Sequence, residues 1–239
     1  DFPAADRRRI LSDVMPGDIM LQNSFAIGNG PVTALSKGLT ASRYLHSAMV
    51  VGRDARGRPL VAESSTPGGL RIVLLDEYLK GRQDVRILRP DYAPGQRDKV
   101  ADRARGLAGK NMGGEYGYDY LMCNADGKDY YCNEFVWKVL ETAGVGTPEG
   151  LRGRVNPANA TRLAPIYLGL ALRPGGLAVG ADAFESLPGV KVVYAGRLDL
   201  PRHPFAKSYL DDIVNGAFSV AGRMGEAART FLNAFAPAR

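Results

Sequence analysis

The stretch that decides the fold of this chain is Tyr130-Tyr131-Cys132-Asn133-Glu134-Phe135-Val136-Trp137. Beyond Cys132 the apolar residues recur at helical spacing as far as Gly144, which is a stop signal, so the pattern predicts a helix over 133–143. Cys132 then lies at the helix N-terminus, where the helix dipole stabilises a thiolate and backbone N–H groups can face an oxyanion. Cys132 is therefore our candidate nucleophile.

A thiol nucleophile needs a base, and the chain contains two histidines, His46 and His203. His46 lies in a segment, 44–51, whose apolar spacing predicts a strand, beside the small residues Ser47 and Ala48. His203 stands between two prolines, in a segment that we interpret as an exposed loop. We therefore expect His46 to be the base, although a single histidine in a strand more often has a structural role.

Glu63 is the candidate third member of the site. The turn residues Arg56-Gly57 separate the strand of His46 from Leu60-Val61-Ala62-Glu63, which predicts a hairpin. Side chains on one face of an antiparallel pair can meet, and a carboxylate there would hold the imidazole in one tautomer. The alternative interpretation is a surface glutamate at a strand end.

Strands and helices are predicted throughout the chain, which indicates an α+β fold. The lead-in 1–13 is compatible with one short helix, and Met15-Pro16-Gly17-Asp18 is typical of a turn. Further strands are predicted at 19–21, 70–75, 85–89 and 191–194, helices at 31–38, 96–106 and 209–235, and a loop at 113–120.

Five motifs occur in a particular order: Pro16-Gly17-Asp18-Ile19, the strand of His46, Val61-Ala62-Glu63, Tyr116-Gly117-Tyr118-Asp119 and Tyr131-Cys132-Asn133-Glu134-Phe135-Val136. In order and spacing the chain resembles the circularly permuted, YiiX-like branch of the NlpC-type papain-like superfamily, related in fold to lecithin:retinol acyltransferase-like proteins. The resemblance covers residues 14–143, and more loosely the strand near 190.

This resemblance implies a papain-like fold, in which an antiparallel sheet packs against helices and the nucleophile stands at a helix N-terminus. It also implies Cys132 as nucleophile, His46 as base and Glu63 as third polar residue. Serine often follows the cysteine in this group, whereas Asn133 follows it here, which we expect to alter the surroundings of the oxyanion. We further expect Tyr44, Tyr131 and Asn133 to contact the substrate.

The function that we expect is that of a cysteine hydrolase, acting as an amidase or peptidase on bacterial cell-wall peptides. The resemblance and the net charge of +6, which favours anionic surroundings, both suit this substrate. A lipid-directed thioesterase, lysophospholipase or acyltransferase is the alternative, and it suits the acyltransferase-like kinship and the amphipathic segment 209–235. A module that binds lipid or peptide without turnover is a second alternative.

The sequence lacks the motifs of metal sites, phosphate-binding loops and serine hydrolases. The two histidines and two cysteines show no paired metal-ligand spacing, and no phosphate loop or serine-hydrolase elbow occurs. We therefore expect no metal or cofactor. The basic residues are scattered and form no nucleic-acid module, so we expect no nucleic-acid partner.

We expect a lead-in (1–13), a hydrolase domain (14–200) and a C-terminal amphipathic extension (201–239), which packs on the core or binds a protein or membrane surface. The first residue is Asp1 rather than Met. One explanation is a removed secretory signal, so we expect a periplasmic or secreted protein. Cys123 competes with Cys132 for the role of nucleophile. A disulfide between the two cysteines would abolish the thiol mechanism.

Overall fold

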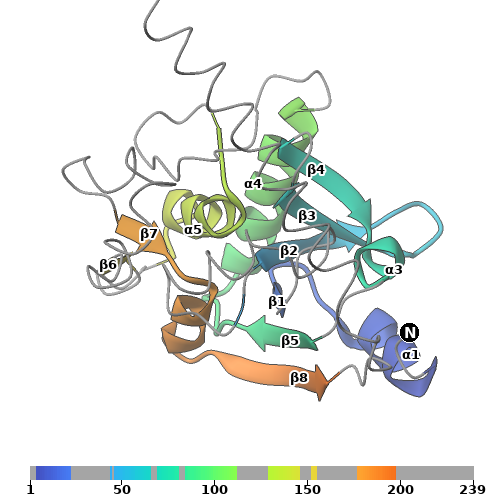
Figure 1. The fold of residues 1–239 in the computed structure, drawn as a ribbon. Helices are drawn as coiled ribbons and strands as arrows, with labels where there is room; N and C mark the ends of the chain where they lie inside the picture. Colours follow the sequence, from blue (N-terminus) through green and yellow to red (C-terminus); the bar gives the residue numbers. More distant parts are fainter. Residues whose placement is uncertain are drawn as a thin grey trace, which may run out of the picture.

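A computed structural model describes residues 4–22, 44, 46–65, 69–80, 84–111, 129–145, 152–154 and 177–197 (Figure 1). The predictions for 31–38, 113–120, Cys123, His203 and 201–239 lie outside these residues. In chain order the elements are α1 (Ala4–Asp13), β1 (Ile19–Gln22), β2 (His46–Arg53), β3 (Pro59–Ser65), β4 (Gly69–Leu74), α3 (Leu75–Tyr78), β5 (Asp84–Arg89), α4 (Gln96–Lys110), α5 (Cys132–Thr142), β6 (Arg152–Arg154), β7 (Leu177–Val179), the 3-10 helix η3 (Ala181–Ser186) and β8 (Lys191–Arg197).

The main sheet has the strand order β4-β3-β2-β1-β5-β8. Each neighbouring pair in this order is antiparallel. β6 and β7 form a separate antiparallel pair. An antiparallel sheet combined with several helices confirms the α+β class expected from the sequence.

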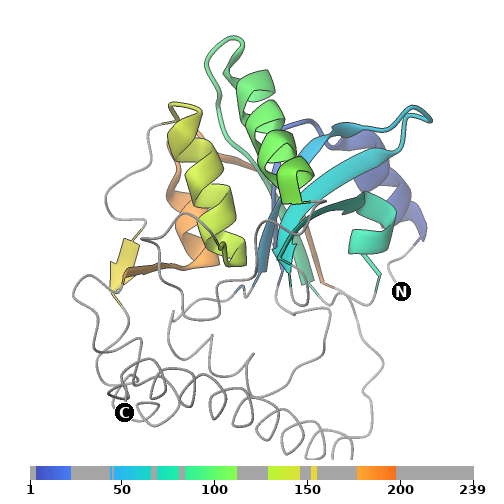
Figure 2. The same ribbon diagram turned by 90° about the horizontal axis from the view of Figure 1, so that it is seen from above.

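The sheet has a hydrophobic core on each face, because successive residues of a strand point to opposite sides. On one face Met49 and Val51 of β2 belong to the cluster that includes Phe135 of α5 and Val100 of α4. On the other face Val50 belongs to the cluster formed with α1 and α3. Figure 2 shows α4 and α5 on one side of the sheet and α1 and α3 on the other.

Most predicted elements are present with small changes of bounds. α4 continues to Lys110, four residues beyond the prediction, because Leu107 and Ala108 extend its buried stripe. α5 begins at Cys132 itself. The short elements α3, β6, β7 and η3 were not predicted. Within the described residues, no helix is long and apolar enough to cross a membrane.

The hairpin predicted around Arg56-Gly57 is confirmed. The N–H of Asp54 donates to the carbonyl of Arg58 over 2.9 Å, and Gly57 adopts a φ of 76°, which favours glycine. The carboxylate of Asp54 also accepts hydrogen bonds from the backbone N–H groups of Arg56 and Arg58, each over 2.9 Å. This turn, together with a β-bulge between Val50 and Gly52 that shifts the register, determines how β2 pairs with β3 and so the relative positions of His46 and Glu63.

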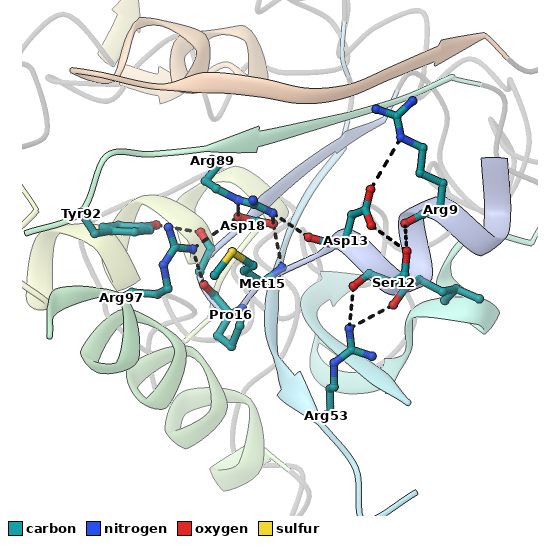
Figure 3. Close-up of polar contacts among 12 residues, drawn as sticks. Arg9, Ser12, Asp13, Met15, Pro16, Asp18, Arg53, Arg89, Tyr92 and Arg97 are labelled. Carbon is teal, nitrogen blue, oxygen red and sulfur yellow. Dashed lines mark hydrogen bonds and ion pairs between the residues drawn. The ribbon is translucent and has the colours of Figure 1, made fainter. Parts of the chain in front are cut away.

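A buried ionic network around Asp18 holds the entry to β1 (Figure 3). Arg89 donates from Nε to Oδ1 over 2.8 Å and from Nη2 to Oδ2 over 2.7 Å. The N–H of Met15 donates to Oδ2 over 2.9 Å, and Nη1 of Arg97 lies 3.5 Å from Oδ1. Tyr92 donates its hydroxyl to the carbonyl of Gly17 over 2.7 Å. The Pro16-Gly17-Asp18 motif therefore has a structural role, away from His46.

Candidate active site

The nucleophile candidate, Cys132, is the first residue of α5. Tyr131 precedes the helix in an extended conformation, and its N–H donates to Oε2 of Glu134 over 3.4 Å. The side chain of Cys132 is a thiol rather than half of a disulfide, and it is buried. The structure thus places the thiol at the helix N-terminus, as the sequence predicted.

His46 is the first residue of β2 and contacts both other candidates. Its Nε2 lies 2.6 Å from Oε2 of Glu63, and its ring also makes a side-chain hydrogen bond with Cys132. Cys132, His46 and Glu63 therefore lie in sequence along one chain of contacts.

The surroundings of His46 favour its charged form. Burial alone lowers the pKa of an imidazole, but the hydrogen bonds and charges of Cys132 and Glu63 outweigh it and raise the pKa of His46 above its usual 6.5. An imidazole that holds its proton more firmly is suited to accept the proton of a thiol. This is the electrostatic condition for a thiolate–imidazolium pair.

Glu63 is fully buried, so the alternative interpretation of a surface glutamate is wrong. Its second oxygen, Oε1, accepts two hydrogen bonds from Arg71 of β4, from Nε over 2.9 Å and from Nη2 over 2.6 Å. Arg71 lies directly opposite Glu63 in the antiparallel register. Our sequence reasoning missed Arg71: it lies within the strand predicted at 70–75, but its place opposite Glu63 depends on the register of the two strands.

Two buried serines tie the nucleophile segment to the sheet. Ser47, next to His46, donates to Oδ1 of Asn133 over 2.7 Å and lies 3.3 Å from the carbonyl oxygen of Cys132. Ser64, next to Glu63, donates to the carbonyl oxygen of Tyr130 over 2.5 Å. Consecutive residues in a strand point to opposite faces. Each strand thus contributes one residue to the triad and the next to anchoring α5.

Further residues surround the imidazole. The ring of Tyr78 in α3 lies 6.1 Å from that of His46, centroid to centroid, at an interplanar angle of 34°. Gln22 of β1 is paired with His46 in the sheet register. Both side chains are buried, and the ring of Tyr78 brings α3 beside the imidazole.

The structure also places the three expected substrate-binding residues. Tyr44, Tyr131 and Asn133 are all buried. The N–H of Tyr44 donates to Oδ1 of Asp182 over 3.2 Å, which links it to η3. Tyr131 and Asn133 flank Cys132, whereas a contact with substrate stays a prediction for all three.

No group of three or more His, Cys, Asp or Glu side chains that could hold a metal ion occurs among the described residues. The triad candidates themselves engage one another and Arg71 instead. The arrangement is that of a thiol, an imidazole and a carboxylate, the side-chain types that thiol catalysis uses.

Comparison with known proteins adds a family and a fold. A family model described as "Permuted papain-like amidase enzyme, YaeF/YiiX, C92 family" matches residues 13–158. The crystal structure of a protein from Escherichia coli O157:H7, described as metalloprotein yiiX, is similar in fold. It has a TM-score of 0.58 and 24% sequence identity, covering 77% of this chain and 98% of that one. A search of curated proteins found no match.

Proposed function

The chain belongs to the family of permuted papain-like amidases that includes YaeF and YiiX, and from this premise we propose that it is a cysteine amidase with Cys132 as nucleophile. The observation that carries the proposal is the position of His46. Its imidazole bridges the thiol at the N-terminus of α5 and a buried carboxylate 2.6 Å away. A nucleophile, a base and an orienting group for the base are the three parts that thiol catalysis needs.

The proposed reaction has two halves. His46 accepts the thiol proton, and the sulfur of Cys132 attacks the carbonyl carbon of the substrate. The oxyanion that forms is stabilised by backbone N–H groups at the N-terminus of α5. His46 then gives its proton to the departing amine, the C–N bond breaks, and an acyl thioester on Cys132 remains.

Water completes the cycle. His46, now neutral, removes a proton from a water molecule, whose oxygen attacks the thioester carbonyl. The C–S bond breaks, a carboxylic acid leaves, and the thiol regains its proton from His46. Glu63 holds the imidazole in one orientation throughout and stabilises it whenever it is charged.

As substrate we propose the peptide of a bacterial cell wall, encountered in the periplasm or outside the cell. The amidase family and the net charge of +6 support an anionic polymer that carries amide bonds. The acyltransferase-like kinship offers an acyl lipid as the competing substrate. The C-terminal segment 201–239 stays a predicted contact with a protein or membrane partner.

The first experiment is a pH titration of the native protein with iodoacetamide from pH 4 to 9, with mass spectrometry to locate the modified cysteine. We expect selective alkylation of Cys132 near pH 6, where an ordinary thiol with a pKa of about 8.5 is largely protonated. The variant His46→Ala should remove this reactivity at low pH. Absence of alkylation in the native protein would favour a non-catalytic binding module.

The second experiment separates the substrates. Purified cell-wall stem peptides and an acyl lipid, such as a lysophospholipid, are offered to the native protein and to Cys132→Ala. Release of an amine from the peptides by the native protein alone supports the amidase. Release of fatty acid from the lipid alone would support the lipid-directed alternative.

A further inference from the structure

The two oxygens of Glu63 have different partners. Oε2 lies 2.6 Å from Nε2 of His46, while Oε1 accepts both hydrogen bonds from Arg71. We propose that Arg71 is a positioning residue of the active site, which keeps Glu63 ionised and turned so that Oε2 faces His46. This inference rests on the proposed thiol mechanism and adds a residue to it.

The reason lies in the charge of His46 during the proposed cycle. The imidazole is charged while the thiolate exists, but it becomes neutral once it has given its proton to the leaving amine. At that moment Glu63, which is fully buried, would be an anion without a cation and would tend to take up a proton. The guanidinium of Arg71 stays charged throughout, because arginine does not lose its proton in proteins.

The geometry also favours positioning over simple stabilisation. The side chain of Arg71 is 43% exposed, whereas that of Glu63 is 0% exposed. The guanidinium therefore keeps contact with solvent, whereas the buried carboxylate depends on its partners for its charged form. The two donors of Arg71 converge on one oxygen, which fixes the rotation of the carboxylate about its last bond.

Several groups face this pair and enter the prediction of pH dependence. Among the described residues, Cys132 and Glu134 lie in the first turn of α5, Tyr78 lies in α3 beside the imidazole, and Arg71 approaches from β4. Of these groups, Arg71 carries the permanent positive charge that contacts Oε1 of Glu63. Its loss should let Glu63 take up a proton or turn away from His46, which removes the negative charge that stabilises the imidazolium and moves the alkylation profile to higher pH.

The test compares Arg71→Met with Arg71→Lys, Glu63→Gln and the native protein, and it measures the rate of Cys132 alkylation against pH. The matched control is Arg9→Met, because Arg9 also pairs with a carboxylate, that of Asp13 in α1, over 3.6 Å, and its side chain is 65% exposed. We expect Arg71→Met to move the alkylation profile to higher pH and to lower the rate at pH 6 by roughly tenfold. A displacement of the profile by one pH unit changes the rate by about tenfold on its low-pH side.

Arg71→Lys should be faster than Arg71→Met, since lysine keeps the positive charge but cannot make both hydrogen bonds to Oε1. Glu63→Gln should move the profile in the same direction as Arg71→Met. Arg9→Met should leave the profile unchanged. A profile of Arg71→Met that superimposes on the native one, or moves to lower pH, overturns the positioning role while the thiol mechanism stands. A native protein without alkylation at low pH overturns both.

Discussion

Nε2 of His46 and Oε2 of Glu63 lie 2.6 Å apart, across the hairpin of β2 and β3, with side chains that are 2% and 0% exposed. Water is therefore nearly excluded from this contact, which strengthens its electrostatic effect compared with a surface pair. The contact also holds the imidazole beside Cys132, the other side chain that it contacts. Four predictions follow from this arrangement and from the structure that supports it.

Glu63→Gln should slow amide hydrolysis by about 100-fold. The amide keeps the size of the carboxylate but removes its charge. It can also donate an N–H to Nε2, which favours the imidazole tautomer that has no proton on Nε2. In serine triads the equivalent change costs about 10⁴-fold. We expect a smaller loss because a thiol ionises more readily than a hydroxyl.

The measurement for Glu63→Gln is kcat/KM on the amide substrate, with Glu141→Gln as control. Glu141 pairs with Lys138 on the exposed side of α5, and its replacement should leave the rate within twofold of the native value. Equal rates for native protein and Glu63→Gln would contradict the role of Glu63.

The stabilising effect of His46 should depend on pH in a defined direction. The pKa of His46 is raised above 6.5 in the folded protein, so the folded state binds this proton more tightly than the unfolded chain. The contribution of His46 to the free energy of unfolding is therefore fully present below pH 6.5, and it is lost as the pH rises through the folded-state pKa. The free energy of unfolding in urea should differ more between native protein and His46→Gln at pH 5.5 than at pH 9. A difference that grows toward pH 9 would contradict the raised pKa.

Ser47→Ala should destabilise the protein by about 1–3 kcal/mol, because it removes the donor to Oδ1 of Asn133 in a buried place. It should also slow alkylation of Cys132, since the first turn of α5 loses one of its anchors to β2. Thermal or urea unfolding measures the first effect. Ser186→Ala, which removes an exposed hydroxyl, is the control and should change stability by no more than about 0.5 kcal/mol.

Asp18→Asn should destabilise the fold by about 3 kcal/mol and leave the chemistry of Cys132 unchanged. The replacement leaves Arg89 without its buried counter-charge, and removal of one member of a buried pair typically costs 3–5 kcal/mol. We expect the lower end because Arg89 is partly exposed. Urea unfolding measures the loss, with the exposed Asp102→Asn as control. An altered alkylation profile in the folded variant would contradict a purely structural role for Asp18.

Much of this site was accessible from the sequence because each signal was local. The turn at Arg56-Gly57 predicted the pairing that brings His46 near Glu63, and the structure has this hairpin. The apolar stripe after Cys132 predicted a helix, and α5 begins at that residue. The order of motifs indicated the permuted papain-like family, which the family match confirms. The catalytic and substrate-binding roles of the named residues stay predictions.

What the sequence did not reveal depends on register between distant segments. Arg71 stands opposite Glu63 because β3 and β4 pair with one particular offset, which no short pattern specifies. In the sequence Ser47 is an ordinary small strand residue. Its hydrogen bond to Asn133 depends on how α5 packs on the sheet. The helix α3 has four residues, too few for a periodic signal, and yet it brings Tyr78 beside the imidazole.

The position of the cysteine along the chain has a consequence for biosynthesis. His46 and Glu63 belong to one local hairpin, whereas the anchor between Ser47 and the carbonyl of Cys132 joins residues 85 positions apart. A ribosome delivers the N-terminal part first, so the hairpin is translated well before the thiol. The contact between the imidazole and the thiol therefore forms only after α5 has been synthesised and has docked on the sheet.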